Sequence, residues 1–133
     1  MTSNYIHSDL TGMIIKAFYT VYNRLGYGFL EKVYENALLI ELRKMNLTCS
    51  AQCPVKVFYD EMQVGYYMAD IIVNDDVIIE IKAAENLSDQ HEAQLTNYLR
   101  ATDIEVGVLL NFGKKPQFKR KVFSAGYKNH NIS

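Results

Sequence analysis

Three charged residues, Asp70, Glu80 and Lys82, lie inside the most apolar segments of the chain. Burying an isolated charge costs several kcal/mol unless the group is paired or binds a metal. Glu80 and Lys82 are two residues apart, so on a β-strand both side chains point to the same face of the sheet. Asp70 lies in the preceding apolar segment. The spacing therefore predicts a cluster of two carboxylates and one ammonium group.

The loop between these two segments decides whether the carboxylates meet. Residues 63–73 and 77–83 are rich in β-branched and aromatic side chains, and the Asn-Asp-Asp sequence at 74–76 separates them. This pattern predicts a β-hairpin. If the loop has three residues, counting back along the hairpin places Asp70 opposite Glu80. Side chains in directly opposed positions are close enough to share one cation.

Two facing carboxylates repel each other unless a proton or a metal ion lies between them. Oxygen ligands select a hard cation, and Mg²⁺ typically takes one or two carboxylates plus waters and substrate phosphate. We therefore expect Asp70 and Glu80 to bind Mg²⁺, for which Mn²⁺ would substitute, and the peptide carbonyl of Ile81 could add a ligand. Lys82 would then orient a water or stabilise charge on a phosphoryl group. The structural alternative is an ion pair of Lys82 with Glu80 or Asp70 at a strand end.

Three further residues are candidates for the same site. Gln94 and Tyr98 are four residues apart on the helix expected after the Glu80 strand, so they share a helix face. Glu31 is expected near the start of an earlier helix, where the helix dipole favours an acidic side chain. The structural alternatives are a solvated helix side for Gln94 and Tyr98, and a purely structural role for Glu31.

Periodicity predicts the elements that position these residues. Apolar residues at three- and four-residue spacing predict helices over 9–25, 29–45 and 88–102. Short apolar or alternating runs predict strands over 55–59, 63–73, 77–83 and 106–112. Residues 118–127 fit either a short strand or irregular structure. The buried stripe expected on the second helix comprises Leu30, Val33, Ala37, Leu38, Leu42 and Met45.

The order α-α-β-β-β-α-β predicts an α/β fold, in which a mixed sheet is flanked by helices. The strand, helix and strand of residues 77–112 predict a parallel crossover. The chain has 133 residues, of which 49% are hydrophobic, so a single domain over 1–133 with a real core is expected.

The bulk composition limits the other classes of function. No apolar run approaches the roughly 18–20 residues that a membrane span needs, and the start lacks signal-peptide features, so a cytoplasmic protein is expected. The net charge is −1, yet residues 106–133 hold six basic side chains and no acidic one. Such an end could contact phosphates or form a solvated tail. A homo-oligomer is compatible with the sequence.

The segment from Gly28 to Tyr34, Gly-Phe-Leu-Glu-Lys-Val-Tyr, resembles the motif of the GxxExxY proteins, which belong to the PD-(D/E)XK nuclease superfamily. The resemblance runs from about residue 10 to 112 and continues at Asp70, at Glu80-Ile81-Lys82 and at Gln94-x-x-x-Tyr98. One departure is Ala69, where the superfamily motif has proline.

The resemblance implies a restriction-endonuclease-like core with Asp70 and Glu80 as metal ligands and Lys82 as the catalytic lysine. It also implies that Gln94 and Tyr98 support the site and contact nucleic acid, and that Glu31 is a helical acid next to the metal. We therefore expect a nuclease that hydrolyses nucleic-acid phosphodiesters with a metal-activated water, DNA being favoured over RNA by analogy. The alternatives are a non-catalytic module that binds nucleic acid or protein, and a structural domain with a buried ion-pair network.

Overall fold

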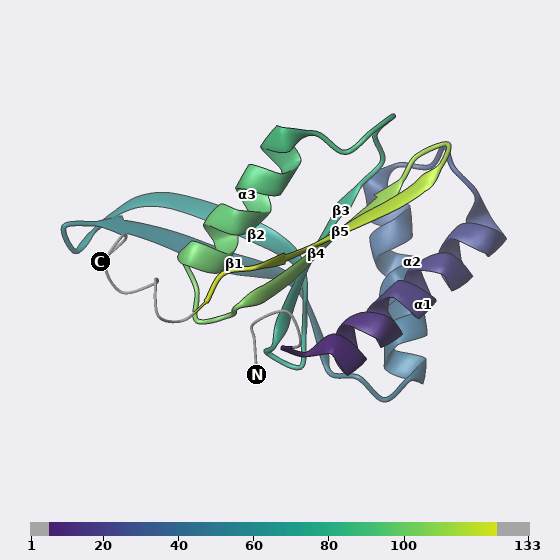
Figure 1. Cartoon of the computed structure of the whole chain (residues 1–133), viewed down its shortest axis with the longest axis horizontal. Helices are drawn as coiled ribbons and strands as arrows, with labels where there is room; N and C mark the ends of the chain where they lie inside the picture. Colours follow the sequence, from purple (N-terminus) through teal and green to yellow (C-terminus); the bar gives the residue numbers. More distant parts are fainter. Residues whose placement is uncertain (1–5, 125–133) are drawn as a thin grey trace.

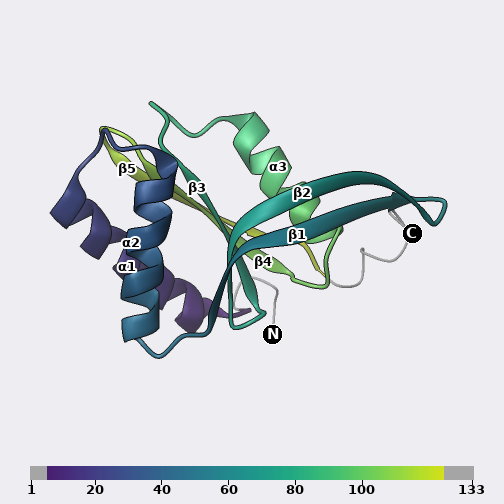
Figure 2. The ribbon, with the colours of Figure 1, turned by 180° about the vertical axis from the view of Figure 1, so that it is seen from behind.

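Helices pack on both faces of a central sheet in residues 6–124, the part of the chain that the computed structural model describes (Figure 1). The elements are α1 (Ser8–Leu25), α2 (Glu31–Lys44), β1 (Cys49–Tyr59), β2 (Met62–Val73), β3 (Val77–Lys82), α3 (Asp89–Arg100), β4 (Val106–Phe112) and β5 (Pro116–Val122). Helices α1 and α2 cover one face of the sheet and α3 covers the other (Figures 1 and 2). This arrangement confirms the predicted α/β class. No helix in this range is long and apolar enough to cross a membrane.

The sheet is mixed, with the strand order β1-β2-β3-β4-β5. Strands β3 and β4 are parallel and are joined through α3, which confirms the predicted crossover, whereas the other neighbouring pairs are antiparallel. Strand β5 pairs with the whole length of β4 and covers an edge that would otherwise be open. The predicted order therefore lacked one strand, and residues 125–127 of the segment predicted there lie outside the described residues.

The hairpin between β2 and β3 has the predicted three-residue loop. Val73 pairs with Val77, and Asn74 and Asp75 have φ angles of 53° and 56°, respectively. Asn and Asp tolerate this left-handed conformation better than most residues, which explains their presence in the turn. The register continues inward as far as the pair Ile71 and Ile79. The next position on each strand holds a carboxylate.

The core forms two layers, one on each face of the sheet. Side chains of α1 and α2, which include Ile14, Phe18, Leu38 and Leu42, pack on alternate positions of β2, β3 and β4, with Phe112 of β4 in the same cluster. On the other face, α3 packs on the intervening positions, with a cluster that includes Val55, Ala69, Ile78, Leu95 and Leu109. The strongly apolar strands β3 and β4 are thus buried on both faces, as their composition predicts.

The stripe predicted on α2 is partly wrong. Leu30 is 81% exposed and Val33 is 39% exposed, whereas Tyr34 is fully buried. The Tyr34 ring stacks on Phe112 with 4.2 Å between ring centroids, and its hydroxyl donates to the Gly26 carbonyl at 2.7 Å. These contacts rotate the helix so that Tyr34, and not Val33, faces the sheet. The helix therefore presents a partly polar face to the site.

We expect Tyr34→Phe to lower the free energy of unfolding by about 1–3 kcal/mol, because the substitution leaves the Gly26 carbonyl and the Phe29 N–H without their shared partner. The ring stack on Phe112 is kept, so the change isolates the hydroxyl. Urea denaturation measures the effect. Tyr59→Phe, at a side chain that is 68% exposed beside the β1–β2 turn, is the matched control. Equal stability of the two variants would contradict the anchoring role of the Tyr34 hydroxyl.

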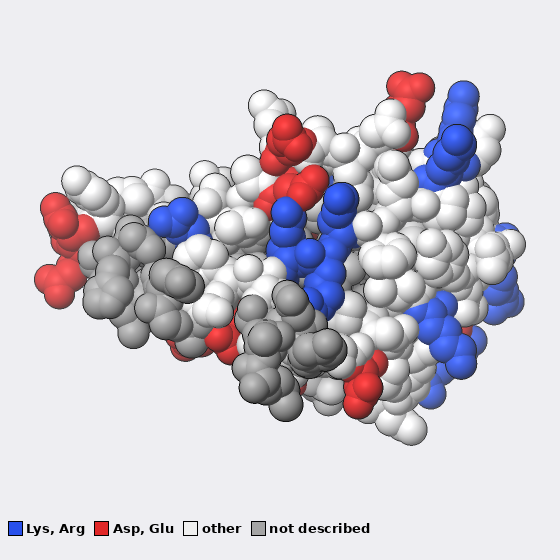
Figure 3. All heavy atoms as spheres, viewed as in Figure 1, with Lys and Arg blue, Asp and Glu red and all other residues white. Residues whose placement is uncertain are grey.

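The basic residues of β5 are divided between the two faces of the sheet. Lys121 pairs with Glu92 on α3, whereas the guanidinium of Arg120 donates to the Ile6 carbonyl just before α1. Figure 3 shows cationic side chains near the centre of one face with acidic side chains directly beside them. Contact of this end with phosphates stays a prediction, and Lys128, one of the basic residues, lies outside the described residues.

Candidate active site

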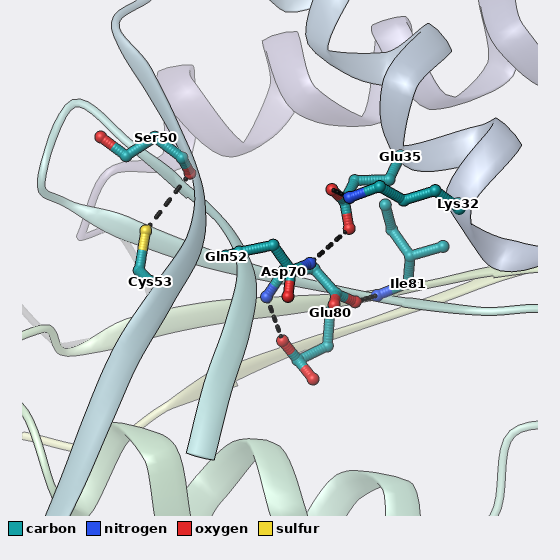
Figure 4. Close-up of polar contacts among 8 residues, drawn as sticks. All are labelled: Lys32, Glu35, Ser50, Gln52, Cys53, Asp70, Glu80 and Ile81. Atoms are coloured by element: carbon teal, nitrogen blue, oxygen red, sulfur yellow. Dashed lines mark hydrogen bonds and ion pairs between the residues drawn. The ribbon is translucent and has the colours of Figure 1, made fainter. Parts of the chain in front are cut away.

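The two carboxylates lie where β2 and β3 separate. Beyond the pair Ile71 and Ile79, side chains replace the backbone ladder between the strands. The Asp70 N–H donates to Glu80 Oε2 at 2.8 Å, and the Ile81 N–H donates to Asp70 Oδ2 at 2.8 Å (Figure 4). Each carboxylate is thereby fixed by the backbone of the opposite strand. The predicted facing positions of Asp70 and Glu80 are what make this exchange possible.

Strand β2 turns over at Asp70. Ile71 packs with the α1–α2 layer, whereas Ala69 packs with the α3 layer, although side chains two residues apart on a regular strand share a face. On β1 the residue across from Asp70 is Gln52, which has a φ angle of 52°. A non-glycine residue in this region is strained by of order 1–3 kcal/mol, and such strain clusters at functional sites. This change of face at Asp70 leaves the residue between the α1–α2 cluster and the α3 cluster.

The oxygen atoms at this point fit a hard cation. Among the described residues, Asp70 Oδ1 and Glu80 Oε1 accept no hydrogen bond. The N–H and C=O of one strand residue point to the same neighbour, so the Ile81 carbonyl also faces the Asp70 side. Within residues 6–124 no group of three or more His, Cys, Asp or Glu side chains is arranged to hold a metal. The donor set matches Mg²⁺, which keeps several waters and needs only one or two carboxylates.

Burial sets the protonation of the pair. Glu80 is only 4% exposed, and burial, followed by the charge of Asp70, raises the pKa of Glu80 to about 8. Burial also raises the pKa of Asp70, and the nearby Glu35 carboxylate raises it further. Without a cation, the pair therefore retains a proton at neutral pH. A bound divalent cation would replace that proton.

Lys82 contacts α3 and not the carboxylates. Its ammonium donates to Gln94 Oε1 at 3.2 Å, and Gln94 Nε2 donates to the Tyr98 hydroxyl at 3.2 Å. None of the ion pairs within residues 6–124 involves Lys82, so the ion pair of the structural alternative is absent from this range. An ammonium has three donor hydrogens, and the Gln94 contact uses one. Its charge lowers the pKa values of both Asp70 and Glu80.

Tyr98 closes this side of the site. It is 5% exposed, and burial, with the negative charges of Glu80 and Asp70 next, raises the pKa of Tyr98 to about 12. The hydroxyl therefore keeps its proton. The alternative prediction, in which Gln94 and Tyr98 lie on a solvated side of the helix, is wrong for Tyr98 because this residue is buried. Gln94 contacts Lys82 directly, and Tyr98 is linked to Lys82 through Gln94.

A comparison with protein families identifies the group to which this arrangement belongs. The family model of the PD-(D/E)XK nuclease superfamily matches residues 8–121. The chain belongs to the PD-(D/E)XK nuclease superfamily. The matched range includes every residue proposed above for the site, which confirms the superfamily resemblance.

A solved structure supports the fold of this superfamily member. The crystal structure of SSO0001 superposes with a TM-score of 0.52 at 18% sequence identity. The match covers 90% of this chain and 60% of that chain, so this superfamily member spans less than two thirds of SSO0001. At this identity the likeness concerns the fold alone. No curated protein sequence matches this chain.

Glu31, the helical acid implied by the resemblance, is the first residue of α2 and is exposed. Its charge raises the pKa values of both Asp70 and Glu80. Glu31 also lines a hollow of about 660 Å³ with Phe29 and Lys114. Its assignment as a metal ligand stays a prediction.

A second helical acid, Glu35, was missed by the sequence reasoning. It is 4% exposed, and its two carboxylate oxygens accept hydrogen bonds from Lys32 Nζ and Gln52 Nε2, both at 2.8 Å. Figure 4 shows Asp70 lying between Glu35 on one side and Glu80 on the other. An acid four residues after Glu31, on the face that also carries buried leucines, was a usable indication for Glu35. Gln52 had none.

We expect the free energy of unfolding of the metal-free protein to fall as the pH rises from about 5 to 8. Glu80 has a raised pKa of about 8 in the folded state, against 4.5 as its ordinary value, so in this window the folded chain binds one more proton than the unfolded chain. Each bound proton contributes a slope of about 1.4 kcal/mol per pH unit. Glu80→Gln should lose most of this slope.

Urea denaturation in EDTA at several pH values measures that slope. Glu61→Gln, at an exposed position of the β1–β2 turn, removes the same charge outside the site and should keep the slope of the parent. The same pH dependence in Glu80→Gln as in the parent would show that another group carries the raised pKa.

Proposed function

We propose that this superfamily member is a Mg²⁺-dependent nuclease that hydrolyses nucleic-acid phosphodiesters, with DNA favoured over RNA as substrate. The observation that carries the proposal is the pair Asp70 and Glu80, held face to face by backbone N–H groups at a strand separation with Lys82 beside it. The buried Glu80 carboxylate facing the half-buried Asp70 carboxylate is costly in a structural protein. A site that exchanges a proton for a metal ion explains why both are present.

The residues divide into ligands and electrostatic groups. Asp70, Glu80 and the Ile81 carbonyl would hold Mg²⁺, and Glu31 would be the acid next to it. When bound, Mg²⁺ supplies a Lewis acid and lowers the pKa of water. Lys82 lies two residues after Glu80 on β3, so both face the same side of the sheet, and Lys82 would stabilise negative charge on the phosphoryl oxygens.

Gln94 and Tyr98 position the ammonium of Lys82. The Gln94 side chain accepts from Lys82 with its oxygen and donates to Tyr98 with its nitrogen, so its orientation is fixed from both ends. Because Tyr98 keeps its proton, it cannot neutralise Lys82. The ammonium charge therefore remains available to the substrate.

A cleavage panel tests the proposed function. Single-stranded, double-stranded and branched DNA, and RNA, would be incubated with Mg²⁺, with Mn²⁺ and with EDTA. We expect cleavage of at least one DNA member with either metal and none with EDTA. Activity that survives the double change Asp70→Asn and Glu80→Gln would come from a contaminating nuclease. A protein that binds metal and nucleic acid but cuts no member would be the non-catalytic binding module.

A further inference from the structure

The β1–β2 hairpin extends beyond the body of the sheet and leaves a groove against α3. Figures 1 and 2 show the hairpin reaching away from α1 and α2, with α3 beside its base. The groove has a volume of about 620 Å³, within the usual range for a small-molecule site. The side chains that matter for its chemistry are Tyr67 on the hairpin and Gln90, Gln94, Asn97, Tyr98 and Arg100 on α3.

This groove is continuous with the proposed catalytic centre. Gln94 lines it and also accepts a hydrogen bond from Lys82. Tyr98 lines it as well, and the carboxylates of Glu80 and Asp70 are near enough to raise its pKa. A ligand in the groove would therefore lie next to a phosphate held at Lys82.

The lining combines three kinds of group. Tyr67 is 49% exposed, so its ring offers a face that the core does not use, and the ring centroid lies 5.9 Å from that of Tyr98. Gln90 and Asn97 supply amide donors and acceptors, and Arg100 supplies a positive charge. Among the residues that the structure describes, none that lines the groove is acidic. An aromatic face, amides and a cation match the ring, the hydrogen-bonding edge and the phosphate of a nucleotide.

We propose that this groove binds one unpaired nucleobase of the substrate, stacked on Tyr67, beside the phosphodiester that is cut. The inference rests on the proposed nuclease function and specifies its substrate class. A base inside a duplex cannot present its face to a protein ring without leaving the stack. The groove therefore selects single-stranded nucleic acid, or ends and flaps with unpaired bases.

Binding in EDTA tests this proposal without cleavage. Fluorescence anisotropy would compare a labelled single-stranded oligonucleotide with a blunt duplex of the same sequence. Stacking on a protein ring typically contributes about 1–3 kcal/mol per base. We expect Tyr67→Ala to weaken single-strand binding by about 10- to 100-fold and duplex binding much less. Tyr67→Phe keeps the ring and should bind as the parent does.

A second measurement reports the stack directly. A 2-aminopurine base in the single strand should be quenched on binding to the parent and to Tyr67→Phe, and should stay bright with Tyr67→Ala. Tyr59→Ala removes an exposed tyrosine at the β1–β2 turn, outside the groove, and is the matched control.

The outcomes separate this proposal from the proposed function. A parent that cuts DNA while Tyr67→Ala binds and quenches as the parent does would overturn the groove assignment alone. A parent that neither binds nor cuts any nucleic acid would overturn both. If Tyr67→Ala instead converts a dimer to a monomer in analytical ultracentrifugation, the groove is covered by a second copy of this chain and the nucleobase assignment fails.

Discussion

We expect Lys82→Ala to lower the rate of phosphodiester cleavage by about 10²–10³-fold, the typical loss when one electrostatic group is removed from an active site. Lys82 contacts Gln94 and makes no ion pair with either carboxylate, so its removal leaves the hydrogen bonds of Asp70 and Glu80 in place. Affinity for Mn²⁺ should not fall. It should rise slightly, because the ammonium charge that repels a cation is gone.

Single-turnover cleavage and Mn²⁺ titration measure the two effects separately. Lys44→Ala is the matched control, since it removes the same charge from an exposed position in the last turn of α2. The cleavage rate of Gln94→Ala should lie between those of the parent and Lys82→Ala, because the Lys82 ammonium remains but loses its hydrogen bond to Gln94. Cleavage at the parental rate in Lys82→Ala would refute the catalytic role of Lys82. Loss of Mn²⁺ binding in Lys82→Ala would show instead that Lys82 holds Asp70 and Glu80 in the position that binds the metal.

The hairpin that brings the carboxylates together could be predicted because its determinants are local. A three-residue loop with Asn and Asp at left-handed positions fixes one pair, Val73 with Val77, and the two-residue period of a strand fixes the positions that follow. Counting three residues along each strand from the pair Val73 and Val77 places Asp70 opposite Glu80. The charged residues stand out because the segments around them are otherwise apolar.

The environment around that pair could not be predicted in the same way, because tertiary contacts determine it. The stacking of Tyr34 on Phe112 sets the rotation of α2, and this rotation buries Glu35 beside Asp70. The helical period alone favoured Val33 at the position that faces the sheet. Gln52 is a further case, since a left-handed non-glycine residue in the middle of a strand depends on surrounding structure that over-determines its strain.

We expect Asp70→Asn to abolish both cleavage and stabilisation by metal. Asparagine keeps an oxygen that can accept from the Ile81 N–H, so the strands should still meet, but the site loses one of its two anionic ligands. In the parent, a cation at 100 times its Kd stabilises the folded state by about 2.7 kcal/mol through mass action. In Asp70→Asn this gain should vanish at millimolar Mg²⁺ or Mn²⁺.

Without metal, in EDTA, the same substitution should stabilise the folded protein. The charge of Asp70 helps to raise the pKa of Glu80, so its removal relieves repulsion between the two carboxylates. We therefore expect metal-free Asp70→Asn to be more stable than the metal-free parent at pH 8, near the raised pKa of Glu80, where a part of the parental protein carries a charged Glu80 next to Asp70. Thermal unfolding with and without Mg²⁺, at pH 6 and pH 8, gives the four comparisons needed.

Asp75→Asn is the matched control for this prediction. Asp75 lies at a left-handed position of the β2–β3 loop, a conformation that asparagine also adopts readily, so the variant removes the same charge without touching the site. It should keep the parental response to Mg²⁺. If Mg²⁺ raises the Tm of Asp70→Asn as much as that of the parent, the cation binds elsewhere on the protein. If EDTA instead leaves Asp70→Asn less stable than the parent at pH 8, the Asp70 carboxylate contributes more through its hydrogen bond to β3 than it costs through repulsion, and the pair is then a structural feature.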